Sequence, residues 1–106
     1  MSAGIAIIER KESNMKIYKY YIGPSLAVLK FDCYEGAEVL SAGLDGNENM
    51  CIWVKVDTAT PPASLKVYCI GTGWDMEDVI GSDKVKFVGT VTQKPYVWHV
   101  FVKEKE

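Results

Sequence analysis

The chain has 106 residues, 48% of them hydrophobic and 25% charged, and its formal net charge at pH 7 is −2. This length matches one domain, and this much apolar surface offsets the entropy of ordering the chain, so we expect a single folded domain. The small negative charge offers no broad attraction for a phosphate backbone or an anionic membrane, and every apolar run is far shorter than a membrane span. Nucleic-acid binding and membrane insertion are therefore not expected.

The start of the chain differs in composition from the rest. A short apolar stretch, Gly4 to Ile8, precedes the charged run Glu9 to Glu12. The pair Lys11-Glu12 can be encoded by a ribosome-binding sequence just upstream of Met15, which favours translation from Met15. The alternative is that Ile5 to Ile8 adds an edge strand to the sheet. We therefore divide the chain into an N-terminal extension, residues 1–14, and one β domain, residues 15–106.

The β domain is rich in β-branched and aromatic residues, with turn residues at short intervals, which is typical of an antiparallel sheet. Asp45-Gly46-Asn47 is a hairpin signal, because Gly and Asn tolerate the positive φ angles of tight turns. A terminal hairpin is expected around Gln93-Lys94. The expected strands are Lys16–Ile22, Leu26–Asp32, Glu38–Leu44, Asn49–Asp57, Ser64–Ile70, Lys84–Thr92 and Pro95–Val102.

Two segments interrupt this pattern. Pro61-Pro62 cannot donate ladder hydrogen bonds, so residues 58–63 are expected to form a loop. Residues 74–83 carry three acids and no strand pattern, which predicts an irregular loop with one short helical turn. About seven strands with short links predict an all-β, mostly antiparallel fold, either a small β-sandwich or a barrel.

Alternation of apolar and polar residues predicts the core. In Asn49–Asp57 it places Ile52, Val54 and Val56 on one face. The closely spaced Tyr18, Tyr20 and Tyr21 put aromatic rings on both faces of the first strand, which indicates burial on both sides or contact with another subunit, so a homo-oligomer is plausible. The other expected core residues are Ile17 or its neighbours, Leu26, Val28, Leu40, Val67, Val85, Phe87, Val97 and Phe101.

The three cysteines, Cys33, Cys51 and Cys69, are odd in number and form no CxxC pair. Each lies in or at the end of an apolar run, where a free thiol usually behaves as a small buried hydrophobe. No secretory signal pattern is recognisable at the start of the sequence. We therefore expect neither a metal site nor a disulfide framework. The expected compartment is the reducing cytoplasm.

The residues that could carry out catalysis are few. His99 is the one histidine and lies in an apolar strand, and no spacing in the sequence shows the nucleophile and acid that a hydrolase would need beside it. Asp75, Glu77 and Asp78 are clustered acids without the spacing of a calcium loop, so a solvated loop is favoured. We expect no catalytic residue, no metal and no cofactor.

Ligand binding has better candidates. The glycine turn Gly71-Thr72-Gly73 would let a phosphate approach the backbone closely, although a turn that ends the strand is the favoured explanation. Three tryptophans, Trp53, Trp74 and Trp98, could form a surface on which a base or sugar ring stacks. Trp74 follows the glycine turn in the irregular segment, and loops carry binding residues more often than strands do. The candidate binding residues are Gly71, Thr72, Gly73, Trp74, Trp53, Trp98 and His99.

Several short motifs resemble those of a family of short proteins, without assigned activity, from tailed bacteriophages and prophages. The family resemblance covers Met15 to about Val102 and is weakest in residues 74–83. Members of that family usually begin at the position of Met15. The resemblance implies a phage origin and a compact β domain, and it implies no activity, cofactor or catalytic residue. Its motifs are KIYKY after Met15, Ile22-Gly23-Pro24, Gly36-Ala37, Val39-Leu40, Cys51 to Val54 with Asp57, Ile70 to Gly73, Phe87 to Val91, and Val97 to Phe101.

Two classes of function follow from these features. The first is a non-enzymatic binding module in the host cytoplasm that engages a host protein or sequesters a small ligand such as a nucleotide signal. The second is a virion or assembly component whose sheet edges contact other subunits. An enzyme ranks third, because the sequence has one histidine and no recognisable catalytic spacing.

Overall fold

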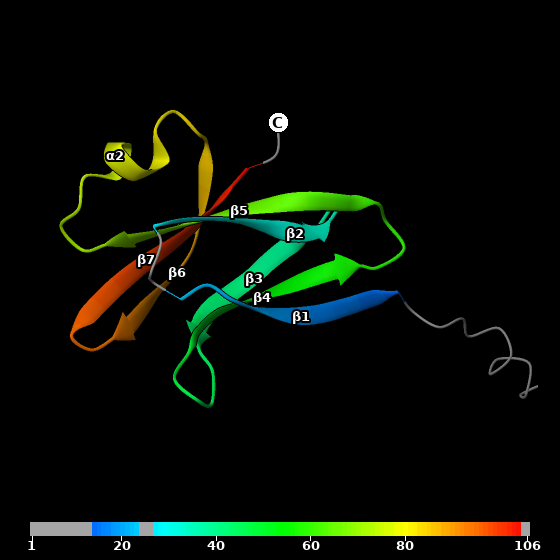
Figure 1. The fold of residues 1–106 in the computed structure, drawn as a ribbon, viewed down its shortest axis with the longest axis horizontal. Coiled ribbons are helices and arrows are strands. Elements are labelled where there is room, and N and C mark those ends of the chain that lie inside the picture. Colours follow the sequence, from blue (N-terminus) through cyan, green and yellow to red (C-terminus); the bar gives the residue numbers. More distant parts are fainter. Residues whose placement is uncertain (1–13, 24–26, 105–106) are drawn as a thin grey trace, which may run out of the picture.

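The computed structural model describes residues 14–23 and 27–104. The alternative edge strand Ile5 to Ile8 and the expected core residue Leu26 lie outside these ranges. Within them, no helix is long and apolar enough to cross a membrane. The elements are β1 (Met15–Tyr21), β2 (Val28–Tyr34), β3 (Glu38–Leu44), β4 (Met50–Asp57), β5 (Pro62–Gly71), α2 (Met76–Ile80), β6 (Val85–Gln93) and β7 (Tyr96–Lys103) (Figure 1).

The strands form two antiparallel sheets. One has three strands in the order β1-β4-β3, and the other has four in the order β2-β5-β7-β6. The prediction of an all-β fold with one short helical turn is confirmed, and of the two architectures considered the structure is the sandwich. Both predicted hairpins are present: β3 and β4 pair across residues 45–49, and β6 and β7 pair across Lys94-Pro95.

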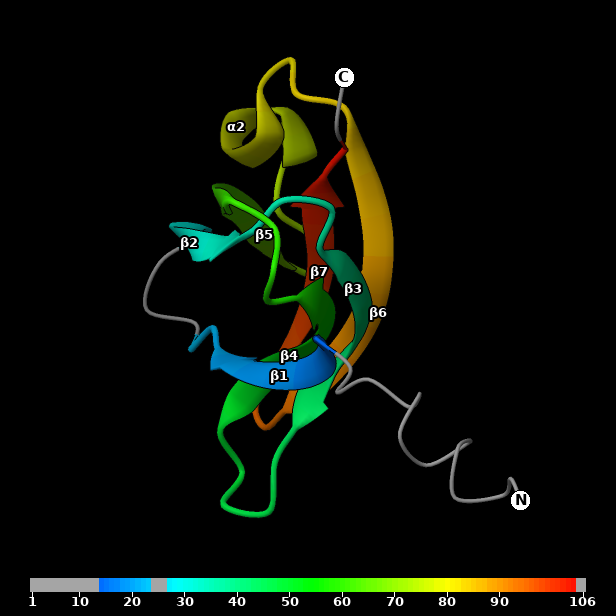
Figure 2. The same cartoon turned by 90° about the vertical axis from the view of Figure 1, so that its right-hand side faces the viewer.

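The two sheets come together at one side and are held apart by aromatic rings at the other. At the near side β3 and β6 run alongside each other (Figure 2), and a Cβ on Gly89 would lie only 3.9 Å from Ala42. At the far side, rings from β1 and β2 fill the gap, with centroids 5.0 Å apart for Tyr20 and Phe31. Tyr18 and Tyr20 pack inward and Tyr21 is 60% exposed, so the prediction of burial on both faces of β1 is wrong, and contact of Tyr21 with another subunit stays a prediction.

The core lies between the sheets and contains the residues that clean alternation identifies. Ile52, Val54 and Val56 of β4 are buried, as is Val67 of β5, so these predictions are confirmed. All three cysteines are buried as well, as the sequence predicts. The inward row of β7 consists of Trp98, Val100 and Val102.

Other core predictions are wrong, and β-bulges explain two of them. The pairing of β3 shifts register between Val39 and Ser41, and that of β6 shifts between Phe87 and Gly89. Because the extra residue of a bulge interrupts the alternation, the pattern of the residues after each bulge does not extend back to Leu40 and Phe87, which face solvent.

The remaining errors are reversals of face. In β1 the prediction of Ile17 or its neighbours is met by Tyr18, which packs inward while Ile17 is exposed. In β2 Leu29 and Phe31 take the inward positions, so Val28 lies outside. In β7 the outward row holds Val97 and Phe101, which are half-buried, and Val85 of β6 is also half-buried.

Two turn predictions also need correction. Residues 58–63 do not all form a loop, because β5 already begins at Pro62, opposite Tyr34. Proline is tolerated as the first residue of a strand. In the β3–β4 turn the positive φ angle belongs to Glu48 rather than to Gly46 or Asn47.

Candidate functional site

The glycine turn at the end of β5 redirects the chain towards α2. Gly71 is the last residue of β5 and is buried, opposite Trp98 of β7. The Thr72 N–H donates to the Val97 carbonyl at 3.2 Å, and the Trp74 N–H donates to the Gly71 carbonyl at 3.0 Å. Gly73 has a φ of 91°, which a residue with a side chain rarely adopts. These contacts are those of a turn that ends a strand.

Gly71 has a second role, which is to make room for the indole ring of Trp74. A Cβ on Gly71 would lie 2.7 Å from Cε2 and 2.8 Å from Nε1 of that ring. Such an approach is too close for any side chain, so only glycine lets the ring rest against the backbone of β5. The missing Cβ therefore accommodates the chain's own tryptophan.

Trp74, Trp98 and Tyr96 form a group that we call the aromatic cluster. The ring centroids of Trp74 and Trp98 are 5.5 Å apart in an edge-to-face arrangement, and those of Tyr96 and Trp98 are 5.7 Å apart and tilted. Trp98 is only 7% exposed, whereas Trp74 is 48% and Tyr96 60% exposed. The cluster therefore joins a buried ring of the core to two rings that reach the surface.

Trp98 carries an unpaired donor in this cluster. Its Nε1 is the one side-chain nitrogen or oxygen, among the described residues, that is buried without a hydrogen-bond partner. A buried N–H normally finds an acceptor, and one left without it costs free energy.

His99 lies on the opposite face of the four-stranded sheet from Trp98, because neighbouring residues of a strand point to opposite faces. Its Nε2 is 2.7 Å from the Thr72 hydroxyl, and its Nδ1 is 3.0 Å from the Thr90 hydroxyl. Both ring nitrogens are thus engaged by hydroxyl groups rather than by a carboxylate. This arrangement is typical of a histidine that ties neighbouring segments together.

Trp53 stands apart from both groups. It lies in β4 opposite Lys19 and Ser41, on the outer face of the three-stranded sheet, with its ring against Gly43. The seven candidate residues are therefore split among three places. Gly71, Gly73, Trp74 and Trp98 lie together, Thr72 and His99 lie on the opposite face, and Trp53 belongs to the other sheet.

Tyr96 is the member of the aromatic cluster that the sequence analysis missed. Its signal in the sequence is its spacing of two residues from Trp98, which places both rings on one face of β7. Beside it, a hollow of about 380 Å³ is lined by Tyr21, Gly23, Asn49, Met50 and Gln93, and Gln93 pairs directly with Tyr96.

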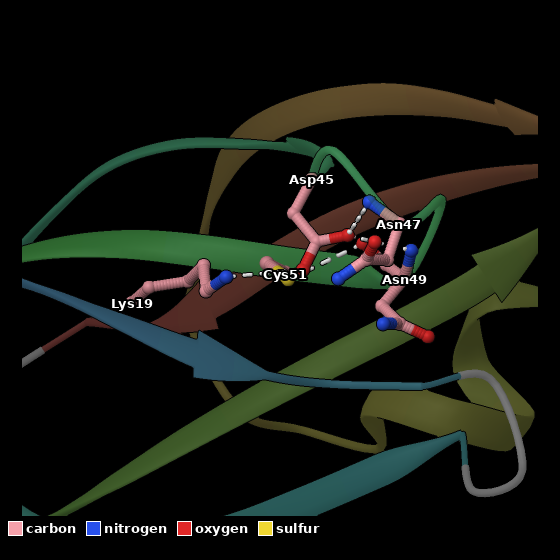
Figure 3. A network of polar contacts seen from close by, with 5 residues as sticks. All are labelled: Lys19, Asp45, Asn47, Asn49 and Cys51. Carbon is pink, nitrogen blue, oxygen red and sulfur yellow. Dashed lines mark hydrogen bonds and ion pairs between the residues drawn. The ribbon is translucent and has the colours of Figure 1, made fainter.

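The β3–β4 turn near this hollow is organised by Asp45. Its Oδ1 accepts the backbone N–H groups of Asn47 and Asn49, each at 2.9 Å, and its Oδ2 accepts from Lys19 Nζ at 3.0 Å (Figure 3). The bond from the Asn49 N–H, together with the Lys19 ammonium, lowers the pKa of Asp45 to about 2. These bonds explain why the turn closes here, and they leave the carboxylate committed to structure.

Asp75, Cys51 and Cys69 also have structural roles. Asp75 caps α2, because its Oδ1 accepts the Glu77 N–H at 3.1 Å. Burial raises the pKa of the Cys69 thiol to about 11, so this thiol stays protonated at neutral pH. Burial likewise raises the pKa of Cys51. The thiols are therefore poorly suited to act as nucleophiles.

Comparison with known proteins gives a family without a function. Residues 13–106 match the family described as "Domain of unknown function (DUF7352)", and the chain belongs to it. Neither the search of curated proteins nor the search of solved structures found a match.

Proposed function

We propose that this member of the DUF7352 family is a non-enzymatic binding module, and that its aromatic cluster receives a planar ring of a small ligand such as a nucleotide signal. The observation that carries this proposal is the position of Trp74, which is half exposed yet held against Gly71 and Trp98. The resemblance to phage and prophage proteins supports the host cytoplasm as the compartment of this module. A ring-bearing side chain of a host protein is the other occupant with the same chemistry.

Three properties of the cluster suit this role. Trp and Tyr rings offer a large, rigid contact area at low entropic cost, and bases stack on them with little dependence on sequence. Two of the rings are accessible, while Trp98 anchors them to the core. The unpaired Nε1 of Trp98 is buried behind these rings, so an acceptor can bond to it only after the rings move. Stacking of this kind is binding without catalysis, which agrees with a non-enzymatic module.

The test is native mass spectrometry of the protein purified from host cells. We expect wild type to retain a small molecule or a host protein that mild denaturation releases, and Trp74→Ala to lose it. Phe87→Ala is the matched control, because Phe87 is 54% exposed, pairs edge to face with Phe101 and lies outside the cluster.

Two results would contradict the proposal. One is a bare wild-type protein, and the other is retention that Trp74→Ala leaves unchanged. Unfolding would not explain a loss of the bound molecule, because a half-exposed side chain contributes little to the core and the change should cost about 1 kcal/mol of stability.

The alternative function, a virion or assembly component, is favoured by the outer face of the three-stranded sheet. Ile17 is 61% exposed there and Leu40 is 44% exposed, next to the half-buried Trp53. On this face Lys55 and Glu38 form an ion pair at 3.3 Å. An apolar face with compensated charges suits contact with another subunit.

Light scattering after size-exclusion chromatography tests this alternative. It predicts an oligomer that Ile17→Thr dissociates and that Val28→Thr, an exposed position on the outer face of the other sheet, leaves intact. A monomeric wild-type protein at every concentration would exclude self-assembly through this face.

A further inference from the structure

A notch lined by four lysines lies where β7 ends within the four-stranded sheet. β5 pairs with β2 along residues 62–68 but with β7 only from Val67 to Gly71, because β7 ends at Lys103, so the first half of β5 extends past that end. The space between them, closed on a third side by the start of β3, has a volume of about 650 Å³. We call it the lysine notch. It is lined by Lys30, Lys66, Lys86 and Lys103, by Glu38 and Glu104, and by Ala37, Val39, Ser64, Leu65 and Val102.

Two of these lysines stand directly opposite each other. Lys30 of β2 pairs in register with Lys66 of β5. Like charges placed opposite each other in an antiparallel pair destabilise the sheet. An anion that bridges such a pair turns the repulsion into attraction. This placement is the feature that points to a negatively charged ligand.

The charges around the notch remain positive after internal pairing. Asp83 binds Lys66 Nζ at 3.0 Å and lies 3.9 Å from Lys103 Nζ, and it also accepts the Tyr68 hydroxyl. Glu38 is compensated by Lys55. Among the described residues, Lys30 and Lys86 form no ion pair within 4 Å, and Glu104 is the one lining carboxylate left to oppose them. A positive site therefore stands on a protein whose net charge is −2.

The notch is separate from the aromatic cluster. Lys66 and Gly71 are five residues apart on β5, which corresponds to roughly 16 Å along a strand. A volume of about 650 Å³ is within the range of small-molecule sites, and Val39, Leu65 and Val102 give the notch an apolar wall. The space is thus suited to a small molecule with several negative charges rather than to a single ion.

We propose that the lysine notch is a binding site for a small, multiply charged anion of the phosphorylated-metabolite class, held by Lys30 and Lys86 with Lys66 and Lys103 beside them. The site does not depend on the function proposed for the aromatic cluster. Either site can be lost without affecting the other.

The test is isothermal titration of wild-type protein with inorganic pyrophosphate at low ionic strength, where screening is weak. We expect saturable binding that is stronger than that of sulfate, and a melting temperature that rises with pyrophosphate concentration. The double variant Lys30→Gln with Lys86→Gln should weaken binding about tenfold or more, which is the effect expected when two charge-assisted hydrogen bonds are lost.

The matched control is Lys16→Gln with Lys94→Gln, two exposed lysines that do not line the notch. This control removes the same charge and should bind pyrophosphate almost as well as wild type. Lys30→Gln also relieves the repulsion with Lys66, so it should not lower the melting temperature in the absence of pyrophosphate, and unfolding would not explain a loss of binding.

Three outcomes overturn the proposal. Pyrophosphate does not bind, it binds no better than sulfate, or the control variant weakens binding as much as the notch variant does.

Discussion

Two turns of this sandwich both redirect the chain at the end of a strand, one through hydrogen bonds and the other through aromatic packing. In the β3–β4 turn, Asp45 gathers two backbone N–H groups and the Lys19 ammonium, so its polar groups are satisfied within the protein. In the turn after β5, the chain places Trp74 half exposed against Gly71 and beside Trp98, whose Nε1 has no partner. The polar groups of Asp45 in the first turn are all paired, whereas the second turn has an exposed ring, Trp74, beside an unpaired N–H of Trp98.

We expect this difference to separate residues that only stabilise the fold from residues that can also bind a ligand. A side chain whose polar atoms are all paired contributes to the free energy of folding and has little left to offer a ligand. In the second turn the buried Trp98 stabilises the core, whereas the half-exposed Trp74 contributes less to folding and is the ring that a ligand can contact. Variants in the two turns should therefore differ in which property they change.

The largest expected effect is that of Trp98→Ala, which removes a buried ring from the core. The variant should lose about 3–5 kcal/mol of the free energy of unfolding, measured by urea denaturation. Trp98→Phe should lose much less, because it keeps most of the apolar contacts and no hydrogen bond of Nε1 is broken. Equal losses for the two variants would contradict this account, because the apolar contacts that phenylalanine keeps would then contribute nothing.

A smaller effect is expected for Gly71→Ala, because the new Cβ would collide with the Trp74 ring. We expect a loss of about 1–3 kcal/mol, typical of overpacking, and a red shift of tryptophan fluorescence as the ring moves into water. In the double variant Gly71→Ala with Trp74→Ala the collision is absent, so the double variant should be more stable than the sum of the single effects predicts. Strictly additive effects would show that Gly71 does not hold the Trp74 ring.

The smallest expected effect is a pH-dependent loss of stability on replacing Asp45 in the β3–β4 turn. The pKa of Asp45 is lowered from 3.8 to about 2, so its carboxylate stabilises the fold above pH 3.8, and this contribution is lost as the pH falls towards 2. Asp45→Asn should therefore have a lower urea midpoint than wild type at neutral pH, and the gap should close in acid. A gap that is constant with pH would contradict the assignment of the stabilisation to the charged carboxylate.

The sequence predicts much of the fold because strands and hairpins depend on nearby residues. Alternation in residues 49–57 identifies the buried face of β4, and Asp45-Gly46-Asn47 identifies the turn before it. The bulges that turn Leu40 and Phe87 outward are not visible in the same way. They lie in β3 and β6, where the two sheets approach each other, so they depend on a contact between strands distant in the sequence.

The candidate site is predictable to a smaller extent. Trp74 is found by its place in an irregular loop, and its exposure agrees with that reasoning. No local pattern reveals that Gly71 makes room for the Trp74 ring, or that Tyr96 belongs to the aromatic cluster. Both depend on contacts between β5, β7 and the loop. The same holds for the lysine notch, since its lysines come from four different strands.

The most direct test of the account is the titration of 15N-labelled protein with a panel of purine and pyrimidine nucleotides, observed through the indole N–H signals of its three tryptophans. These signals can be assigned by replacing each tryptophan with phenylalanine. The account predicts that one or more nucleotides shift the signals of Trp74 and Trp98 together, while Trp53 stays in place. Signals that do not move for any nucleotide, or that move equally for Trp53, would contradict a nucleotide-binding role for the aromatic cluster.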